Sequence, residues 1–174
     1  PVELEHTLKA DDLELFCRPV KAADERRLQE YLYDLSERSV YLRFLQVRKA
    51  FPHQLAQRLV AVDYEQNLGM VCTKGTSDTS PIVAAGHWML DYDDNMAEVA
   101  FSVADEYQRK GIGTHLLHFL MRIARERGIR GFKATVMLGN TAMMRVFQKS
   151  DCVVHTDVEH SEVSVWVRFD EKAE

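Results

Sequence analysis

Apolar residues recur along the chain with the two periods that distinguish strands from helices. Alternation over residues 13–18 predicts a strand that Pro19 ends, and Asp24 lies where it can cap a following helix. The buried stripe of that helix is expected at Leu28, Tyr31, Leu32 and Leu35. Residues 36–51 mix aromatics and arginines without a period and are expected to be irregular. A second helix is predicted over residues 52–62.

The rest of the chain has the pattern of strands joined by turns and two further helices. We expect strands over residues 68–73, 82–90, 98–103, 132–138, 153–156 and 163–169. Gly128 ends a helix with an apolar face over residues 116–124, and Asn140 is placed to cap a short helix through Gln148. The order β-α-α-β-β-β-α-β-α-β-β predicts one α/β domain with a mixed sheet over residues 1–174.

The composition is that of an ordinary globular domain. Of 174 residues, 46% are hydrophobic and 28% are charged, and a chain of this length buries about 70% of its unfolded surface. No apolar run approaches the roughly 20 residues of a membrane helix, and the start lacks a signal-peptide pattern. The net charge of −5 argues against a nucleic-acid partner. We expect a cytoplasmic protein, whose Pro1 start fits either processing or excision from a longer chain.

The three cysteines, Cys17, Cys72 and Cys152, are odd in number and far apart. No C-x-x-C pair or Cys/His cluster occurs in the sequence, so we expect neither a disulfide framework nor a zinc site. His115 and His118 share a helix face at i,i+3, but two ligands are too few to hold a metal. The sequence therefore predicts no metal, and reduced cysteines fit the cytoplasmic setting.

A glycine-containing turn with two basic residues joins the strand over residues 98–103 to the next helix. It reads Gln108-Arg109-Lys110-Gly111-Ile112-Gly113. The first turn of a helix leaves its backbone N–H groups unpaired and carries about half a positive charge. Glycine lets a phosphate approach those amides, and Arg109 and Lys110 add positive charge. The turn is therefore suited to bind a pyrophosphate.

Two common phosphate-binding motifs do not match this turn. A dinucleotide-binding fingerprint requires a third glycine where this chain has Leu116, and an acidic residue where it has Lys133-Ala134-Thr135. A Walker A loop requires Gly-Lys-Ser/Thr where the chain has Gly113-Thr114-His115. Neither nucleotide-binding class fits the turn.

Two separated motifs resemble those of the GNAT acetyltransferases. Residues 97–103, followed by the turn over residues 108–113, are similar to motif A of that family, Gln/Arg-x-x-Gly-x-Gly/Ala. The segment that starts at Asn140 and carries Phe147 is similar to the family's next helix. Similarity to the bacterial Pat-type protein-lysine acetyltransferases lies in residues 39–44, 62–65, 86–88 and 97–98. The resemblance implies the GNAT fold, a mixed and mostly antiparallel sheet with a splayed parallel strand pair.

The resemblance also implies acetyl-CoA as co-substrate, bound where strands 98–103 and 132–138 splay apart. The pantetheine arm is expected beside Phe101, Ser102 and Val103. The pyrophosphate is expected on the amides of Gln108, Arg109, Lys110, Gly111, Ile112, Gly113 and Thr114. Asn140, Met143 and Phe147 are expected to flank the arm. Pat-type proteins modify lysines of proteins such as acyl-CoA synthetases, and their domain often adjoins a regulatory module, so a protein substrate and such a fusion are implied here.

Glu98 is the predicted general base. A lysine amine has a pKa near 10.4, so about one in a thousand is nucleophilic at neutral pH and a base has to remove the proton. Glu98 lies on the strand face opposite Val99 and Phe101, where related enzymes carry a glutamate. The alternative role is a solvent-facing or ion-paired carboxylate. Phe147 departs from the family's tyrosine, so no side-chain acid is predicted there for the leaving thiolate.

Four residues are predicted to lie near the acceptor amine. Tyr41, Arg43 and Phe44 belong to a segment that corresponds to the family's substrate-side loop, and His87 can orient the substrate. The alternative for each is packing in the protein interior.

Three functions remain open on the sequence. The first is transfer of an acetyl group to a protein lysine by direct attack in a ternary complex. The second is acetylation of a small amine or a protein N-terminus, and the third is a non-catalytic acyl-CoA-sensing module. A nucleophilic Cys72 or Cys152 would instead require an acetyl-enzyme, and neither has a base nearby in the sequence.

Overall fold

A single eight-stranded sheet runs through the computed structural model, which describes residues 2–174 and leaves Pro1 outside the described part. The strand order is β1-β2-β3-β4-β5-β6-β8-β7. The strands are β1 His6–Ala10, β2 Leu13–Pro19, β3 Asn67–Thr73, β4 Ile82–Asp91, β5 Met96–Val103, β6 Gly131–Met137, β7 Cys152–Glu159 and β8 Glu162–Lys172. All neighbours pair antiparallel except β5 and β6, which are parallel. The predicted mixed, mostly antiparallel GNAT sheet is confirmed.

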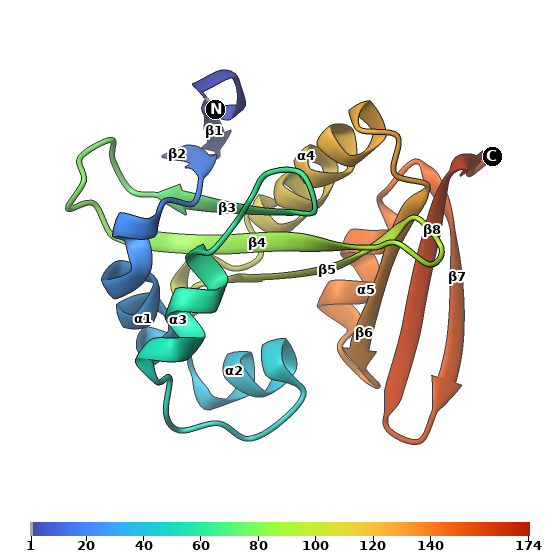
Figure 1. Cartoon of the computed structure of the whole chain (residues 1–174). Coiled ribbons are helices and arrows are strands. Elements are labelled where there is room, and N and C mark those ends of the chain that lie inside the picture. The colour runs from blue at the N-terminus through green and yellow to red at the C-terminus, as the bar shows by residue number, and fades with distance from the viewer. Residues whose placement is uncertain (1) are drawn as a thin grey trace.

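Helices cover both faces of this sheet. They are α1 Glu25–Asp34, α2 Glu37–Phe44, α3 His53–Val60, α4 Ile112–Glu126 and α5 Thr141–Gln148, with the 3-10 turns η1 Val2–Leu4, η2 Ala22–Asp24 and η3 Asp105–Tyr107. Figure 1 shows α4 above the central strands, whereas α1, α2 and α3 lie below them. One apolar core therefore forms between the sheet and α4 with α5, and a second forms under α1 to α3.

The predicted apolar stripes account for both cores. Leu28, Tyr31, Leu32 and Leu35 are all buried in the second core, as the spacing indicates. Helix α4 buries Ile112, Leu116, Leu117, Leu120, Ile123 and Ala124 in the first. It ends before Gly128, whose φ of +74° is the left-handed conformation that glycine adopts without strain. Asn140 caps α5 as predicted, since its side chain accepts a hydrogen bond from the amide of Met143.

Two elements differ from the sequence prediction. The segment over residues 36–51 was predicted to be irregular, but its first half forms α2, which Ser36 caps by accepting a hydrogen bond from the Ser39 amide. Only Val40 of this helix is buried, so it shows no clear apolar period. Strand β1 was not predicted because its five residues are too few to establish alternation.

Asp24 does not cap α1 with its side chain as predicted. Its carboxylate is fully buried and accepts two hydrogen bonds from Arg18 at 2.7 Å each, a third from the Lys21 amide at 2.7 Å, and one from Arg27. Burial opposes ionisation, but the hydrogen bonds from Arg18 and Lys21 lower the pKa of Asp24 below its usual value. This ion pair joins β2 to the start of α1.

Candidate active site

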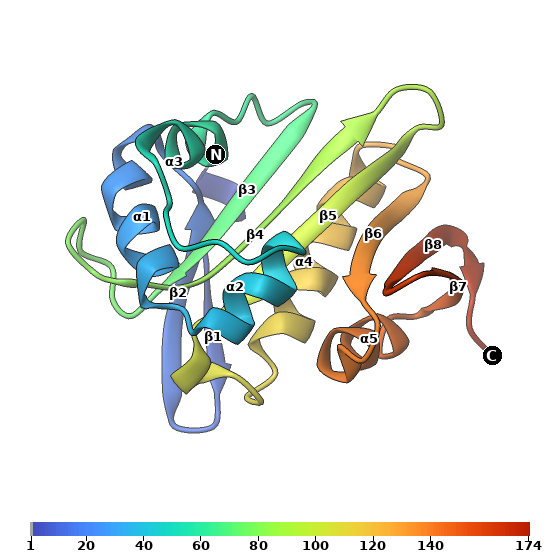
Figure 2. The same cartoon turned by 90° about the horizontal axis from the view of Figure 1, so that it is seen from below.

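The two parallel strands β5 and β6 pair over three positions and then separate. The last register pair is Glu98 with Lys133, so β5 beyond Glu98 has no strand on that side. Figure 2 shows β6 turning away from β5 toward α5. Half of the β5 backbone groups beyond this point lose their ladder partner, which leaves donors and acceptors for an extended ligand. The splayed pair predicted for the pantetheine arm is present.

A narrow cavity of about 30 Å³ occupies the opening between the two strands. Its lining comes from β5, β6, α5 and α2 and consists of Leu42, Arg43, Val99, Ala100, Phe101, Ala134, Thr135, Val136, Asn140, Met143 and Phe147. The structure thus brings the predicted Phe101, Asn140, Met143 and Phe147 together around one slot. Ser102 and Val103 continue β5 past this point and are half-buried.

The glycine turn before α4 has the backbone conformation of an anion-binding nest. Arg109 and Gly111 both have positive φ, +62° and +82°, which turns successive amides toward one side. His115 is the first residue of the helix whose amide bonds back, to the carbonyl of Gly111 at 3.0 Å. The amides of Ile112, Gly113 and Thr114 therefore lack an intrahelical partner. With the exposed Arg109 and Lys110 beside them, these amides fit a pyrophosphate.

Hydrogen bonds between polar side chains connect the nest to α2, and the sequence analysis did not predict the roles of Ser36, Ser39 and Asp105. The Gln108 side chain donates to the carbonyl of Val103 at 2.9 Å and to Ser39 Oγ at 3.1 Å. Asp105 accepts hydrogen bonds from the amide and hydroxyl of Ser36 and from the Ser39 hydroxyl. Partial burial opposes ionisation, but the Ser36 hydrogen bonds lower the pKa of Asp105. The sequence signal for this region was Ser36, since serine is a residue type favoured at a helix N-cap.

Glu98 stands at the vertex of the opening with its side chain exposed. It lines a second, open cavity of about 400 Å³ that also contains Ala134 and Thr135, the residues it shares with the narrow slot. The neighbouring Lys133 ammonium is held by Asp91 at 2.7 Å and Asp94 at 3.0 Å. Within residues 2–174, no hydrogen bond or ion pair engages the Glu98 carboxylate. It is therefore free to contact a ligand in the larger cavity.

Arg43 and His87 meet beside the slot, although they come from α2 and β4. Arg43 Nη2 lies 3.4 Å from His87 Nδ1, which is a weak contact. Burial first, and then the Arg43 charge, lower the pKa of His87 to about 3, so its ring is neutral at pH 7. Tyr31, which the sequence analysis assigned only to the core, contacts the Ser102 hydroxyl with its own at 2.8 Å. These four side chains line a further cavity of about 30 Å³ and form a polar wall there, and of the four only Arg43 also lines the slot.

Tyr41 and Phe44 do not join this wall. Phe44 packs against Phe51 with ring centroids 5.8 Å apart and stacks under the Arg43 guanidinium at 4.8 Å. Tyr41 is exposed on α2. Neither lines the slot, the larger cavity or the cavity beside Tyr31. Of the three residues predicted near the amine entrance, the structure brings only Arg43 to the slot.

Phe147 and the two candidate cysteines supply neither an acid nor a reactive thiol. Phe147 is fully buried in the slot and has no proton to give. Cys72 lies against Cys17, and this contact together with burial raises the pKa of the Cys72 thiol. Burial, followed by the Asp151 charge, also raises the pKa of Cys152. Both thiols are therefore protonated at neutral pH, which disfavours an acetyl-enzyme.

A slot between splayed parallel strands and an amide nest on the following helix are the two features expected of a site for an extended acyl carrier with a pyrophosphate group. Residues 22–151 match the acetyltransferase (GNAT) family. The chain therefore belongs to the GNAT family of N-acetyltransferases, which use acetyl-CoA as co-substrate. Among residues 2–174, no helix is both long and apolar enough to cross a membrane.

Individual relatives agree with this assignment. The acetyltransferase Pat of Mycolicibacterium smegmatis is 32% identical over 156 residues, which are 89% of this chain and 42% of the relative. The chain thus spans less than half the length of that protein. The acetyltransferase PA5475 of Pseudomonas aeruginosa is 27% identical over 82% of this chain and 77% of its own length. The GNAT domain of S. lividans PAT has a TM-score of 0.88 at 26% identity, covering 97% of this chain and 99% of that domain.

Proposed function

We propose that this domain transfers the acetyl group of acetyl-CoA to a lysine side chain of a protein, with Glu98 as general base. The observation that carries the proposal is the position of Glu98. The exposed carboxylate lies at the vertex of the strand opening, between the narrow slot beside which we place the pantetheine arm and an open cavity that can admit an acceptor. A base at this point can reach an amine that enters from the cavity while the thioester lies in the slot.

The reaction is a direct displacement. Glu98 takes a proton from the lysine ammonium, and the neutral amine attacks the thioester carbonyl. A new C–N bond forms, the C–S bond breaks, and the oxyanion formed in between is stabilised by a β5 amide left unpaired beyond Glu98. Because Phe147 cannot act as an acid, CoA leaves as a thiolate and takes its proton from water. The raised thiol pKa values of Cys72 and Cys152 support attack without an acetyl-enzyme.

Access to the larger cavity favours a protein acceptor. The cavity is open, and the exposed side chains Arg130 and Arg168 line it together with Lys133 and Trp166. A side chain that projects from a protein surface can enter such a cavity, and the guanidinium groups can contact acidic residues around it. The relationship to acetyltransferase Pat supports the same acceptor class. Acyl-CoA synthetases, which the Pat resemblance implies, are the protein class that we propose to test first.

The proposal is tested by incubating the domain with isotopically labelled acetyl-CoA and a cell extract, followed by mass spectrometry of proteins and small molecules. Labelled acetyl-lysine in proteins, enriched in acyl-CoA synthetases, is the expected result. Label found only on small amines or protein N-termini would overturn the protein-lysine assignment. Acetyl-CoA binding without labelled product would identify the domain as a sensor.

A further inference from the structure

Three neighbouring strands place a histidine and two cysteines in one row. His6 of β1 pairs directly with Cys17 of β2, and Cys17 pairs directly with Cys72 of β3. Residues opposite each other in antiparallel strands project from the same face of the sheet. Cys17 and Cys72 are fully buried, and their sulfurs are in contact at 2.6 Å. The sequence showed no Cys/His cluster because these residues are up to 66 positions apart; the sheet forms one.

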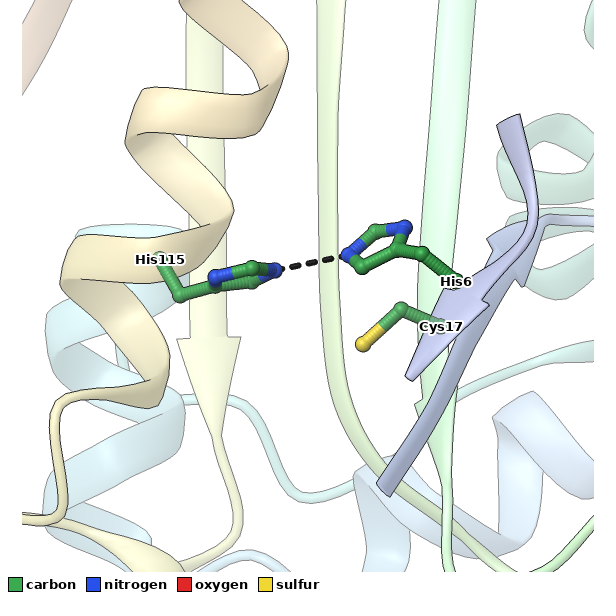
Figure 3. Close-up of side chains that lie close together, drawn as sticks. All are labelled: His6, Cys17 and His115. Atoms are coloured by element: carbon green, nitrogen blue, oxygen red, sulfur yellow. Dashed lines mark hydrogen bonds between the residues drawn. The ribbon is translucent and has the colours of Figure 1, made fainter. Parts of the chain in front are cut away.

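Helix α4 brings a second histidine over this row. His115 Nε2 lies 2.7 Å from His6 Nε2, and the ligand atoms of His6, Cys17 and His115 all lie within 4.8 Å of one another. Figure 3 shows the two imidazole rings pointing at each other from α4 and β1, with the Cys17 sulfur below them. His118, the partner that the helix spacing suggested for His115, instead contacts the carbonyl of Lys149. The cluster therefore links the sheet edge to α4.

The hydrogen bonding of His6 orients the ring as metal-binding histidines are oriented. Its Nδ1 lies 3.2 Å from the carbonyl of Leu4, and a contact with a carbonyl requires the proton on Nδ1. Nε2 then accepts the hydrogen bond that His115 Nε2–H donates at 2.7 Å, so its lone pair points toward His115 and away from the Leu4 carbonyl. Ligating histidines commonly donate their other ring N–H to a backbone carbonyl in this way.

We propose that His6 Nε2, His115 Nε2 and Cys17 Sγ bind a Zn²⁺ ion, with Cys72 Sγ as the fourth ligand. Two imidazoles and two thiolates form a common tetrahedral zinc set, and the three-residue cluster contains no carboxylate that would suit Mg²⁺ or Ca²⁺. Zinc–nitrogen bonds of about 2.0–2.1 Å place two tetrahedral nitrogens about 3.3 Å apart. The His6 and His115 nitrogens have to separate by less than an ångström from their present contact, and the ring proton of His115 has to move to Nδ1. Zinc–sulfur bonds of about 2.3 Å place two thiolates about 3.8 Å apart, so the Cys17 and Cys72 sulfurs have to separate by about an ångström from 2.6 Å. On binding, the cysteine thiols release their protons to solvent.

The site would connect the N-terminal hairpin to the phosphate turn. His115 is in the first turn of α4, and its amide bonds to the carbonyl of Gly111 in the nest. A zinc ion held by β1, β2, β3 and α4 would therefore fix the start of this helix against the sheet. It lies away from Glu98, because β4 and β5 follow β3 in the sheet. The role that this geometry supports is structural, and it does not depend on the proposed acetyl transfer.

The test uses an untagged chain of residues 1–174 kept under reductant. We expect one zinc per chain by elemental analysis after zinc loading and desalting. Zinc at about 100 times its dissociation constant should raise the Tm by about 5–10 °C. Replacement by Co²⁺ should give the visible bands of a tetrahedral ion and thiolate charge-transfer absorption. These three measurements on the unmodified chain do not require any variant to fold.

Variants assign the ligands. His115→Ala and Cys17→Ser should lose the zinc-dependent rise in Tm, whereas the matched controls His118→Ala and Cys152→Ser should keep it. His115 is only half-buried, so its variant remains informative if Cys17→Ser does not fold. Wild-type protein that retains no zinc, shows no Co²⁺ bands and has the same Tm with and without zinc would overturn the proposal. A zinc-dependent rise in Tm that His115→Ala leaves unchanged would overturn it as well.

Discussion

Glu98 and Lys133 are the last residues that pair β5 with β6 before the two strands separate. The Lys133 ammonium is occupied by Asp91 and Asp94, so it does not neutralise the Glu98 carboxylate. The position at which the sheet opens for the co-substrate thus carries an unpaired acid that faces the larger cavity. The slot proposed for the co-substrate and the proposed base thus lie side by side because of one feature of the fold, the separation of β5 from β6.

Gly111→Val should weaken acetyl-CoA binding by about tenfold or more. Gly111 has a φ of +82°, and the left-handed conformation costs a residue with a side chain about 1–2 kcal/mol, more for a β-branched one. If the variant relieves that strain by changing its backbone conformation, the amides of the nest no longer point toward one ligand. Calorimetric titration with acetyl-CoA measures the change.

Gly128→Val is the matched control for this experiment. Gly128 lies at the other end of α4 with a φ of +74°, and a Cβ at either glycine would meet nothing within 4 Å. Both variants should lose similar amounts of stability, but only Gly111→Val should lose acetyl-CoA affinity. Equal affinities for the two variants would contradict binding at the nest.

Asn140→Ala should lower the free energy of unfolding by about 1 kcal/mol, because it removes the side chain that caps α5. Asn140→Asp keeps an acceptor for the Met143 amide and should retain that stability. Both variants remove the side-chain amide that the slot presents. We therefore expect both to bind acetyl-CoA more weakly, while chemical denaturation separates their stabilities. If Asn140→Asp binds acetyl-CoA with wild-type affinity, the Asn140 side-chain amide does not contribute to binding.

Asp24→Asn should destabilise the fold by about 3–5 kcal/mol at pH 7, since it leaves the buried Arg18 guanidinium without its counter-charge. The folded-state pKa of Asp24 is lowered, so its contribution is complete above its usual pKa near 3.8 and is lost as the pH falls below that value. Urea denaturation from pH 7 down to pH 3 should show this loss in wild type and a flatter profile in the variant. Matching profiles would show that Asp24 contributes nothing to acid sensitivity.

Most of the fold and part of the candidate site could be predicted from local sequence patterns. The apolar stripes of α1 and α4, the cap at Asn140 and the basic glycine turn are all encoded within a few neighbouring residues, so they could be predicted. Helix α2 could not, because it buries only Val40. The contacts of Arg43 with His87 and of Tyr31 with Ser102 depend on how α2, α1, β4 and β5 are arranged in space. The His6 and His115 contact likewise forms only when the hairpin meets α4.

Gly111 and Gly113 differ in whether the backbone itself requires glycine. Both were predicted as positions where a side chain would obstruct a phosphate, and that stays a prediction. A Cβ at Gly113 would lie 3.5 Å from Phe101 Cε2 and 3.7 Å from Val146 Cγ2, which is ordinary contact. Gly113 also lacks a positive φ, so only Gly111 is required by backbone conformation. The spacing of the motif alone did not distinguish the two.

The role of Glu98 is the central claim, and Glu98→Gln tests it with little change in shape. The variant should bind acetyl-CoA like wild type, because the nest and the slot are untouched. Its turnover with a lysine acceptor should fall about 10²–10⁴-fold, the usual contribution of a general base. Glu14→Gln is the matched control, since Glu14 is an exposed carboxylate on β2, away from the opening.

The most direct measurement is the turnover of wild type, Glu98→Gln and Glu14→Gln as a function of pH at saturating acetyl-CoA. Only Glu98→Gln should be slow at neutral pH, and its rate should recover as the pH rises, because more of the acceptor lysine is then already deprotonated. A Glu98→Gln variant that is as fast as wild type at neutral pH would contradict the assignment of Glu98 as the base.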